Sequence, residues 1–265
     1  MNRGSWVLAG IVLGLFPIAP ACADFPSLDR FSGLVGGEYD YARMPRSGHA
    51  DQYSLDGAAL VTFENPGLVL QVEGRDVRLS GVKNGGGAWS ADSDLFWRDN
   101  KGTFGVTAGY VRADTDVALN LPAGVNFETY GFFGEYYVLR NLTLQMKGSA
   151  TTGGTRTGSY GGDGGLIFYD YPDLAFHASA GITAFAGGDD LFDVDSYLEY
   201  LPFESVPVSV YAGYDWTNIS RTGYASTVFA GLRIHIGGGT TLADDDRTGP
   251  IAWTGGAEPG MRQRF

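Results

Sequence analysis

The fold is decided by two segments near the end of the chain: residues 206–216, V-P-V-S-V-Y-A-G-Y-D-W, and residues 224–236, Y-A-S-T-V-F-A-G-L-R-I-H-I. In both segments nearly every second residue is apolar, whereas Asp215, Arg233 and His235 all fall on the opposite face. A period of two residues predicts β-strands. Strands of about ten residues with one apolar face are typical of proteins that cross a membrane as a β-barrel.

Segments of the same kind recur along the chain, and turn residues bound each of them. The predicted strands are residues 31–42, 54–64, 68–79, 88–98, 103–112, 127–139, 142–150, 160–169, 174–184, 193–201, 206–216 and 224–236. This count of about twelve is even, as in bacterial single-chain barrels. We therefore predict an all-β, up-and-down transmembrane barrel. A miscount by one hairpin near the glycine-rich strand at Tyr160 would change the number of strands to ten or fourteen.

The links between these strands alternate in length. Short links fall at residues 65–67, 99–102, 140–141, 170–173 and 202–205, and longer links fall at residues 43–53, 80–87, 113–126, 151–159, 185–192 and 217–223. Outer-membrane barrels have short periplasmic turns and longer extracellular loops. The alternation therefore predicts modest extracellular loops and places both ends of the chain in the periplasm.

Nearly every charge inside a predicted strand falls on the face opposite the apolar one. A charge at the middle of a lipid-facing wall costs about 2–4 kcal/mol, so the charged face is expected to line the lumen. The expected lumen-lining residues are Glu38, Asp40, Asp56, Glu73, Arg75, Asp92, Asp94, Glu135, Lys147, Asp163, His177, Asp195, Glu199, Asp215 and Arg233. Acidic residues predominate among them, which favours cations or small polar solutes over anions.

Two further patterns bear on the wall and the lumen. Outward aromatic residues such as Trp97 and Trp89 gather near the two ends of the strands, as expected for belts at two membrane interfaces. A secreted soluble sandwich or lipocalin-like barrel also alternates, but it does not require two aromatic belts. Many inward positions, among them Gly105, Gly213 and Gly231, are small, which predicts some open volume in the lumen.

The first residues have the pattern of a secretory signal peptide. Arg3 precedes a short apolar core at residues 6–16, and Ala21-Cys22-Ala23 forms a cleavage site of the A-x-A type. We expect residues 1–23 to be removed, residues 24–236 to form the barrel, and residues 237–265 to form a periplasmic tail without periodicity. A lipoprotein with Cys22 as the lipidated residue is the alternative. Cys22 is the chain's single cysteine, so the mature protein has no disulfide.

Several short stretches resemble a group of porin-like outer-membrane proteins. The resemblance involves F-A-G-L-R-I-H-I-G-G-G at residues 229–239, T-L-A-D-D-D-R-T-G-P at residues 241–250, G-E-Y-Y at residues 134–137 and V-S-V-Y-A-G-Y at residues 208–214. It implies an outer-membrane location and a porin-like barrel, and it implies no substrate or catalytic residue. Phe265 is similar to the aromatic ending that the barrel assembly machinery recognises, although no alternating strand precedes it.

The sequence contains few candidates for chemistry. His177 and Ser179 share a lumen face with Asp163 and Asp195 on flanking strands, which raises a Ser-His-Asp hydrolase as one hypothesis. His177 lies near a short turn and faces inward, so a lumen histidine bonded to a carboxylate is the preferred interpretation, and His235 is interpreted in the same way. The acidic stretches at residues 187–190 and 243–246 lack the spacing of a calcium loop and are interpreted as solvated turns.

We therefore predict a narrow passive channel in the outer membrane and no enzyme. The alternatives are a non-conducting structural or surface-interaction barrel and, third, an outer-membrane hydrolase. No cofactor or metal is expected, and the formal net charge of −12 argues against nucleic acid. The expected partners are outer-membrane lipid, lipopolysaccharide and, during biogenesis, the barrel assembly machinery. The sequence names neither the solute nor the oligomeric state.

Overall fold

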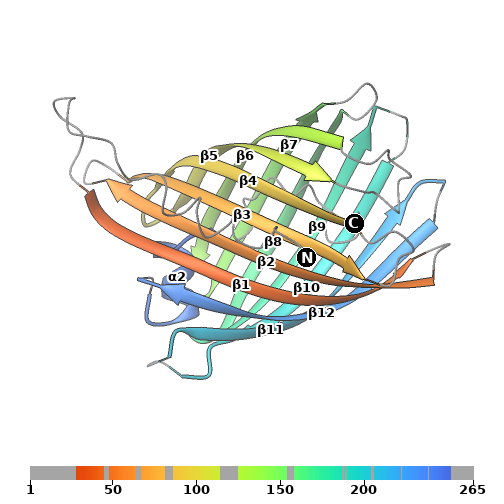
Figure 1. Ribbon diagram of the computed structural model, residues 1–265. Helices are drawn as coiled ribbons and strands as arrows, with labels where there is room; N and C mark the ends of the chain where they lie inside the picture. The colour runs from red at the N-terminus through yellow and green to blue at the C-terminus, as the bar shows by residue number, and fades with distance from the viewer. Residues whose placement is uncertain are drawn as a thin grey trace, which may run out of the picture.

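The computed structural model shows a closed β-barrel of twelve antiparallel strands (Figure 1). It describes residues 28–44, 48–63, 67–80, 86–113, 125–153, 158–186, 188, 190–203, 206–221, 223–237 and 239–251. The strands are β1 Leu28–Met44, β2 Gly48–Phe63, β3 Leu68–Ser80, β4 Gly86–Arg98, β5 Gly102–Ala113, β6 Val125–Leu139, β7 Leu142–Thr152, β8 Ser159–Tyr171, β9 Leu174–Phe185, β10 Asp190–Tyr200, β11 Val208–Ile219 and β12 Gly223–Ile236. The predicted fold class and strand count are confirmed. The predicted signal peptide lies outside the described residues.

Each strand pairs with its neighbours in sequence, and β1 closes the barrel by pairing with β12. The register at this closure places Gly36 opposite Arg233 and Glu38 opposite Gly231. Because the sheet closes on itself, the backbone groups of β1 and β12 are hydrogen-bonded to each other and do not form an open edge.

Several predicted links have other lengths in the structure. The long link expected at residues 217–223 is reduced to residues 220–222, and the short link expected at residues 202–205 extends over residues 201–207. The largest difference is in the first hairpin. Residues 43–53 were expected to form a long loop, but β1 continues to Met44 and β2 already begins at Gly48. Polar and aromatic residues continue the alternation there on the outer face: Tyr39 donates a hydrogen bond to Asp51 at 2.7 Å, and Tyr41 stacks on His49. Polar and aromatic pairs across the two strands extend the hairpin. Apolar periodicity does not reveal such pairs, because their members are polar or aromatic.

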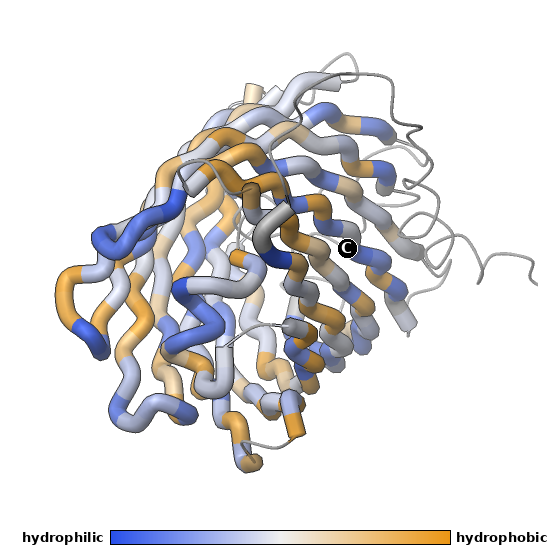
Figure 2. Tube along the Cα trace, turned by 90° about the vertical axis from the view of Figure 1, so that its left-hand side faces the viewer, coloured by the Kyte–Doolittle hydropathy of each residue, from blue (hydrophilic) through white to orange (hydrophobic). Residues whose placement is uncertain are grey.

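The outer surface of the barrel is apolar. Val106, Leu144 and Val210 are exposed, whereas their neighbours Thr107, Thr143 and Ser209 are buried. Hydropathy alternates along the strands, and orange and blue bands follow one another in Figure 2. This is the expected arrangement of a wall that faces hydrocarbon on the outside.

The inner face also carries large apolar residues, which corrects the expected open lumen. Aromatic rings lie over inward glycines on the adjacent strands: a Cβ at Gly213 would collide with Tyr197 and Phe229, and one at Gly231 would collide with Tyr211. Gly105 is covered in the same way by the rings of β4 and β6. These glycines are small because an aromatic neighbour fills the space above them, so they do not mark open volume.

The described part of the chain contains one helix, α2 at Leu242–Thr248. The Thr241 side chain caps its start by accepting a hydrogen bond from the Asp244 backbone N–H at 3.1 Å. No helix among the described residues is long and apolar enough to cross a membrane. Helix α2 lies at the end of the barrel that carries the short turns 99–101, 140–141 and 172–173, which we call the tight-turn end (Figure 1).

Candidate functional site

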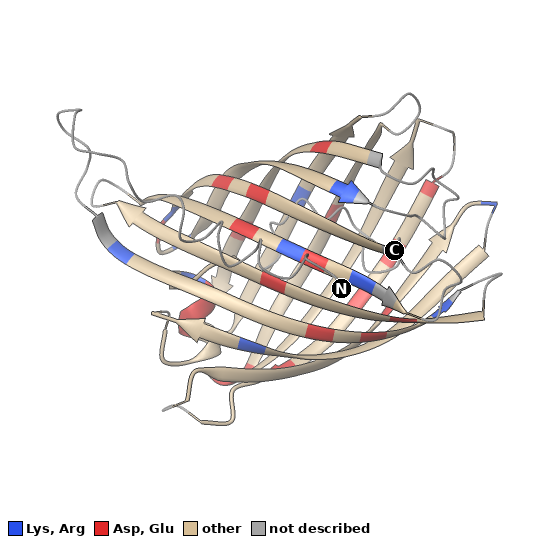
Figure 3. Cartoon of the chain, in the orientation of Figure 1, with Lys and Arg blue, Asp and Glu red and all other residues tan. Residues whose placement is uncertain are grey.

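The predicted lumen residues lie on the inner face of the barrel in two groups. Nine of them, Glu38, Asp40, Asp92, Asp94, Glu135, Lys147, Glu199, Asp215 and Arg233, are buried. Asp56, Glu73, Arg75, Asp163, His177 and Asp195 are half-buried. By position, seven of the fifteen lie on strands β1 to β4, where more of the ribbon is red for Asp and Glu than blue for Lys and Arg in Figure 3, and the other eight lie on β6 to β12.

The wall formed by β1 to β4 is acidic and hydrogen-bonded. Arg75 donates to Glu38 at 3.1 Å, and Gln52 donates to Asp40 at 2.7 Å. Glu73 and Asp92 are opposite each other in the register of β3 and β4. Four neighbouring strands therefore present carboxylates toward one side of the lumen. We call Glu38, Asp40, Asp56, Glu73, Asp92 and Asp94 the acidic wall.

The second group centres on Glu199 of β10. Its carboxylate accepts a hydrogen bond from Arg233 at 2.7 Å and one from the Ser209 hydroxyl at 2.6 Å, and His177 Nε2 lies 3.6 Å away. His177 also stacks on Tyr197 with ring centroids 4.1 Å apart. The structure thus directs His177 toward Glu199 and Tyr197, as expected for a lumen histidine beside a carboxylate.

A Ser-His-Asp arrangement does occur, but with residues other than the predicted ones. Ser209 Oγ lies 2.9 Å from His235 Nε2, and His235 Nδ1 lies 2.7 Å from Asp245 Oδ2. Glu199 is ionised against Arg233, so the Ser209 hydroxyl must donate its proton to Glu199 and accept one from His235. A serine that is fully buried and whose proton is already donated to Glu199 is not placed as a nucleophile.

Asp245 belongs to a part of the chain that was predicted to be a tail outside the barrel. Residues 239–251, which we call the inner segment, instead pack against inward-facing side chains at the tight-turn end. The expectation of solvated turns at residues 243–246 is therefore wrong: this stretch lies in α2, and Asp245 is only 8% exposed. The residues 252–265 of the predicted tail lie outside the described residues.

Two apolar anchors hold the inner segment. Leu242 packs in a buried cluster with Ile167, Tyr169, Ala175 and Leu201. Ile251 packs in a second cluster with Leu60, Val69, Phe96 and Phe133. These partners come from six strands and the link after β10, so burial of the two side chains fixes the segment across the width of the barrel.

Polar contacts also fix the position of the inner segment. We call the side chains of the barrel that contact it the seat. Gln71 bonds both the N–H and the carbonyl of Ile251, at 2.8 and 2.9 Å. Arg98 donates to the Gly249 carbonyl at 2.7 Å. Arg247 donates to the carbonyls of Leu139 and Arg140, both at 2.8 Å. Backbone groups that are buried inside a barrel must find such partners, and here side chains of the wall supply them.

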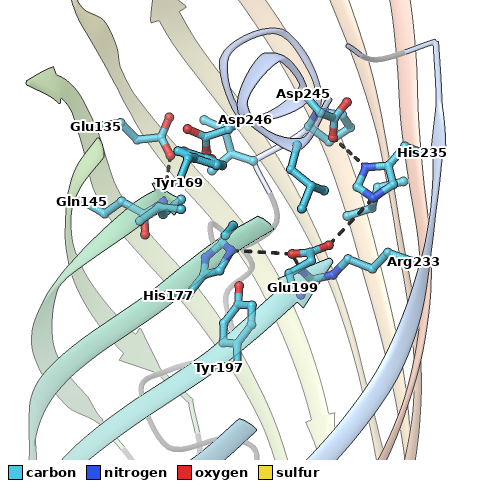
Figure 4. A pocket seen from close by; sticks show the side chains of 16 residues that line it. Glu135, Gln145, Tyr169, His177, Tyr197, Glu199, Arg233, His235, Asp245 and Asp246 are labelled. Atoms are coloured by element: carbon cyan, nitrogen blue, oxygen red, sulfur yellow. Dashed lines mark hydrogen bonds and ion pairs between the residues drawn. The ribbon is translucent and has the colours of Figure 1, made fainter. Parts of the chain in front are cut away.

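A cavity of about 70 Å³ separates the inner segment from the wall (Figure 4). Glu135, Gln145, His177, Glu199, Asp245 and Asp246 are among the residues that line it. Its volume accommodates a few water molecules and is well below the roughly 300 Å³ at the lower end for small-molecule sites. Within the described ranges, no group of three or more His, Cys, Asp or Glu side chains is arranged to hold a metal ion.

Asp246 faces Glu135 across this cavity. It accepts hydrogen bonds from the hydroxyls of Thr143, at 3.0 Å, and Tyr169. As a residue Asp246 is only partly buried, but its carboxyl end is directed at the wall. Burial and the negative charge of Glu135 raise the pKa of Asp246 to about 7.

Sequence reasoning missed the residues that hold the inner segment. Gln71 and Ser209 are uncharged, so a search for charged lumen residues passed over them, and inward Leu60 and Phe133 broke the expected polar pattern. One local signal was present: Thr241 followed by acidic residues is a helix-capping pattern. A closed antiparallel barrel with an apolar exterior and a polar, partly filled interior has the architecture of a transmembrane β-barrel.

No protein-family model matches the sequence, and the search of curated proteins finds no match. Solved structures do resemble the fold. An outer-membrane channel from Pseudomonas putida F1 has a TM-score of 0.60 at 12% identity, covering 82% of this chain and 99% of that one. The NanC porin has a TM-score of 0.56 at 9% identity and covers 76% and 98%, and the KdgM porin has 0.50 at 12% and covers 75% and 98%. The chain therefore has the fold of outer-membrane porins.

Proposed function

We propose that the chain is an outer-membrane channel through which small cations and small polar solutes diffuse passively. The observation that carries this proposal is the acidic wall, in which six carboxylates on four adjacent strands face the lumen beside Arg75. Carboxylates that line a pore favour cations over anions. The fold shared with outer-membrane channels supports an outer-membrane location. We further propose that lipid and lipopolysaccharide surround the apolar wall and that both ends of the chain lie in the periplasm.

The filled parts of the lumen make the proposed channel narrow. Rings of Tyr197, Tyr211 and Phe229 lie on one side of the interior, with centroids 6.0–6.4 Å apart. The inner segment occupies part of the tight-turn end. Solutes of the size of a hydrated ion fit such a passage better than large substrates.

A non-conducting barrel is the second candidate, and one specific observation favours it. The inner segment is held by two apolar anchors and by hydrogen bonds from several strands. If this seat never opens, the barrel would serve as a scaffold or as a surface for interaction.

Conductance of the refolded protein in planar lipid bilayers separates the two candidates. A channel gives discrete openings, and its reversal potential in a KCl gradient shows preference for potassium. Glu73→Gln combined with Asp92→Asn should lower that preference, because both carboxylates belong to the acidic wall. Asp76→Asn is the matched control, since Asp76 pairs with Arg78 on the outer face of the same strand. Absence of openings at every pH, even after removal of the inner segment, would contradict the channel.

A further inference from the structure

The seat of the inner segment contains two acid–base contacts that join α2 to the wall (Figure 4). In the first, Asp245 lies 2.7 Å from His235 of β12. In the second, Asp246 of α2 faces Glu135 of β6. Both pairs join the inner segment to strands of the barrel, and the second depends on how many protons its two carboxyl groups hold.

The carboxyl groups of Asp246 and Glu135 face each other across an enclosed cavity. Gln145 donates to Glu135 at 3.0 Å, and Thr143 donates to Asp246 at 3.0 Å. Two ionised carboxylates in such surroundings repel each other, whereas a shared proton removes the repulsion. The raised pKa of Asp246, about 7, is consistent with a proton held there at neutral pH.

Other charged and titratable groups face this pair from the elements packed around it. Arg98 of β4 provides a cation, but its guanidinium already donates to the Gly249 carbonyl. Tyr137 of β6 and Tyr169 of β8 are neutral hydroxyls near the pair, and Arg247 of α2 is directed away, toward the turn carbonyls 139 and 140. These groups lessen the repulsion between the two carboxylates but do not remove it.

The contact between His235 and Asp245 holds α2 beside the carboxyl pair. The His235 imidazole is hydrogen-bonded to Asp245 through Nδ1 and to Ser209 through Nε2, and Glu199 lies 3.8 Å from Nε2. Arg233 and His177 are the other titratable groups on this side, and both are drawn to Glu199.

We propose that the inner segment is a proton-controlled stopper of the channel, seated at the tight-turn end while Asp246 holds its proton and released when Asp246 loses it. This inference rests on the proposed channel function and adds its regulation. Deprotonation of Asp246 adds a repulsion at Glu135 and so weakens the attachment of α2 to the barrel wall. The stopper is therefore closed in mildly acidic medium and opens as the pH rises through about 7.

Single-channel recordings of the full mature chain between pH 5.5 and 8.5 test the stopper. The ratio of open to closed time should rise by up to about tenfold per pH unit for each proton released. A chain truncated after residue 238 should conduct at every pH. Migration of heated and unheated samples in detergent gels verifies that each barrel is folded.

Substitutions at the carboxyl pair identify the group that senses pH. Asp246→Asn and Glu135→Gln each remove the repulsion while keeping a polar group of the same shape, so each variant should stay closed at pH 8.5. Asp244→Asn is the matched control, because Asp244 lies on the same helix, carries the same charge and is exposed. It should open with the wild-type pH profile.

Each result has a definite meaning. If the truncated chain and the full chain conduct alike at every pH, the stopper is refuted while the channel stands. If the full chain opens equally at pH 5.5 and 8.5, or if Asp246→Asn follows the wild-type profile, proton control is refuted. If the truncated chain shows no openings, the proposed channel function itself fails.

Discussion

Ile251 provides the most direct measure of how strongly the inner segment is seated. Its side chain is 3% exposed and packs against Leu60, Val69, Phe96 and Phe133 inside the barrel. Truncation of a buried isoleucine to alanine costs about 2–5 kcal/mol. Because the seat borders a cavity that can admit water, we take the lower bound, about 2 kcal/mol, which corresponds to a roughly 30-fold shift of the equilibrium toward the released segment.

Ile251→Ala should therefore raise the open-to-closed ratio about 30-fold in bilayer recordings at pH 6, where the wild type is expected to be closed. Ile251→Val removes one methylene group, costs about 0.5–1.5 kcal/mol, and should raise the ratio by roughly 2- to 12-fold. The graded response distinguishes packing from an indirect effect of substitution.

Ile234→Ala is the control for this prediction. Ile234 lies on β12 and is 45% exposed on the outer face, so the same truncation removes contact with lipid and leaves the seat intact. The reasoning is refuted if Ile251→Ala gates like the wild type, or if Ile234→Ala opens the channel to the same extent. In either case the cluster around Ile251 would not hold the segment in place.

Two further predictions concern the stability of the barrel in lipid vesicles, measured by urea unfolding. Arg233→Met leaves Glu199 without its cation in a buried position and should cost about 3–5 kcal/mol, whereas Arg78→Met, in an exposed pair on the outer face, should cost less than about 1 kcal/mol. Equal losses for the two variants would show that the lumen network does not stabilise the fold. Val106→Arg places a charge on the outward face in the middle of β5 and should cost about 2–4 kcal/mol, against about 0–1 kcal/mol for Leu139→Arg at the end of β6. A Val106→Arg variant as stable as the wild type would argue against a hydrocarbon environment around the wall.

The local sequence pattern is sufficient to predict the two faces of the barrel wall. Each strand must place apolar residues outward and polar residues inward, so the faces of β11 and β12 are readable from every second residue. The hairpin of β1 and β2 shows the limit of this signal. Beyond the apolar belt its strands alternate polar and aromatic residues, and apolar periodicity ends before the strands do.

The interior depended on contacts that no local pattern contains. In the sequence, the inward glycines predict open space in the lumen. In the structure, the strand register places aromatic rings opposite them, as for Gly213 and Phe229, and these rings fill that space. The chemistry of the candidate site likewise depends on hydrogen bonds between residues that are far apart in the sequence. Ser209 has no distinguishing sequence context, and its role follows from the positions of Glu199 and His235 on two other strands.

The sequence by itself determined the strands, their faces and the closed barrel, because the two-residue period of a strand and the cost of a charge in lipid act on each segment separately. Only the tertiary structure decided where residues 239–251 lie. Helix α2 has seven residues, too few to show a helical period, and Ile251 meets Gln71 from a distance of 180 positions in the chain. Such a contact depends on the shape of the assembled lumen, which no single stretch of sequence encodes.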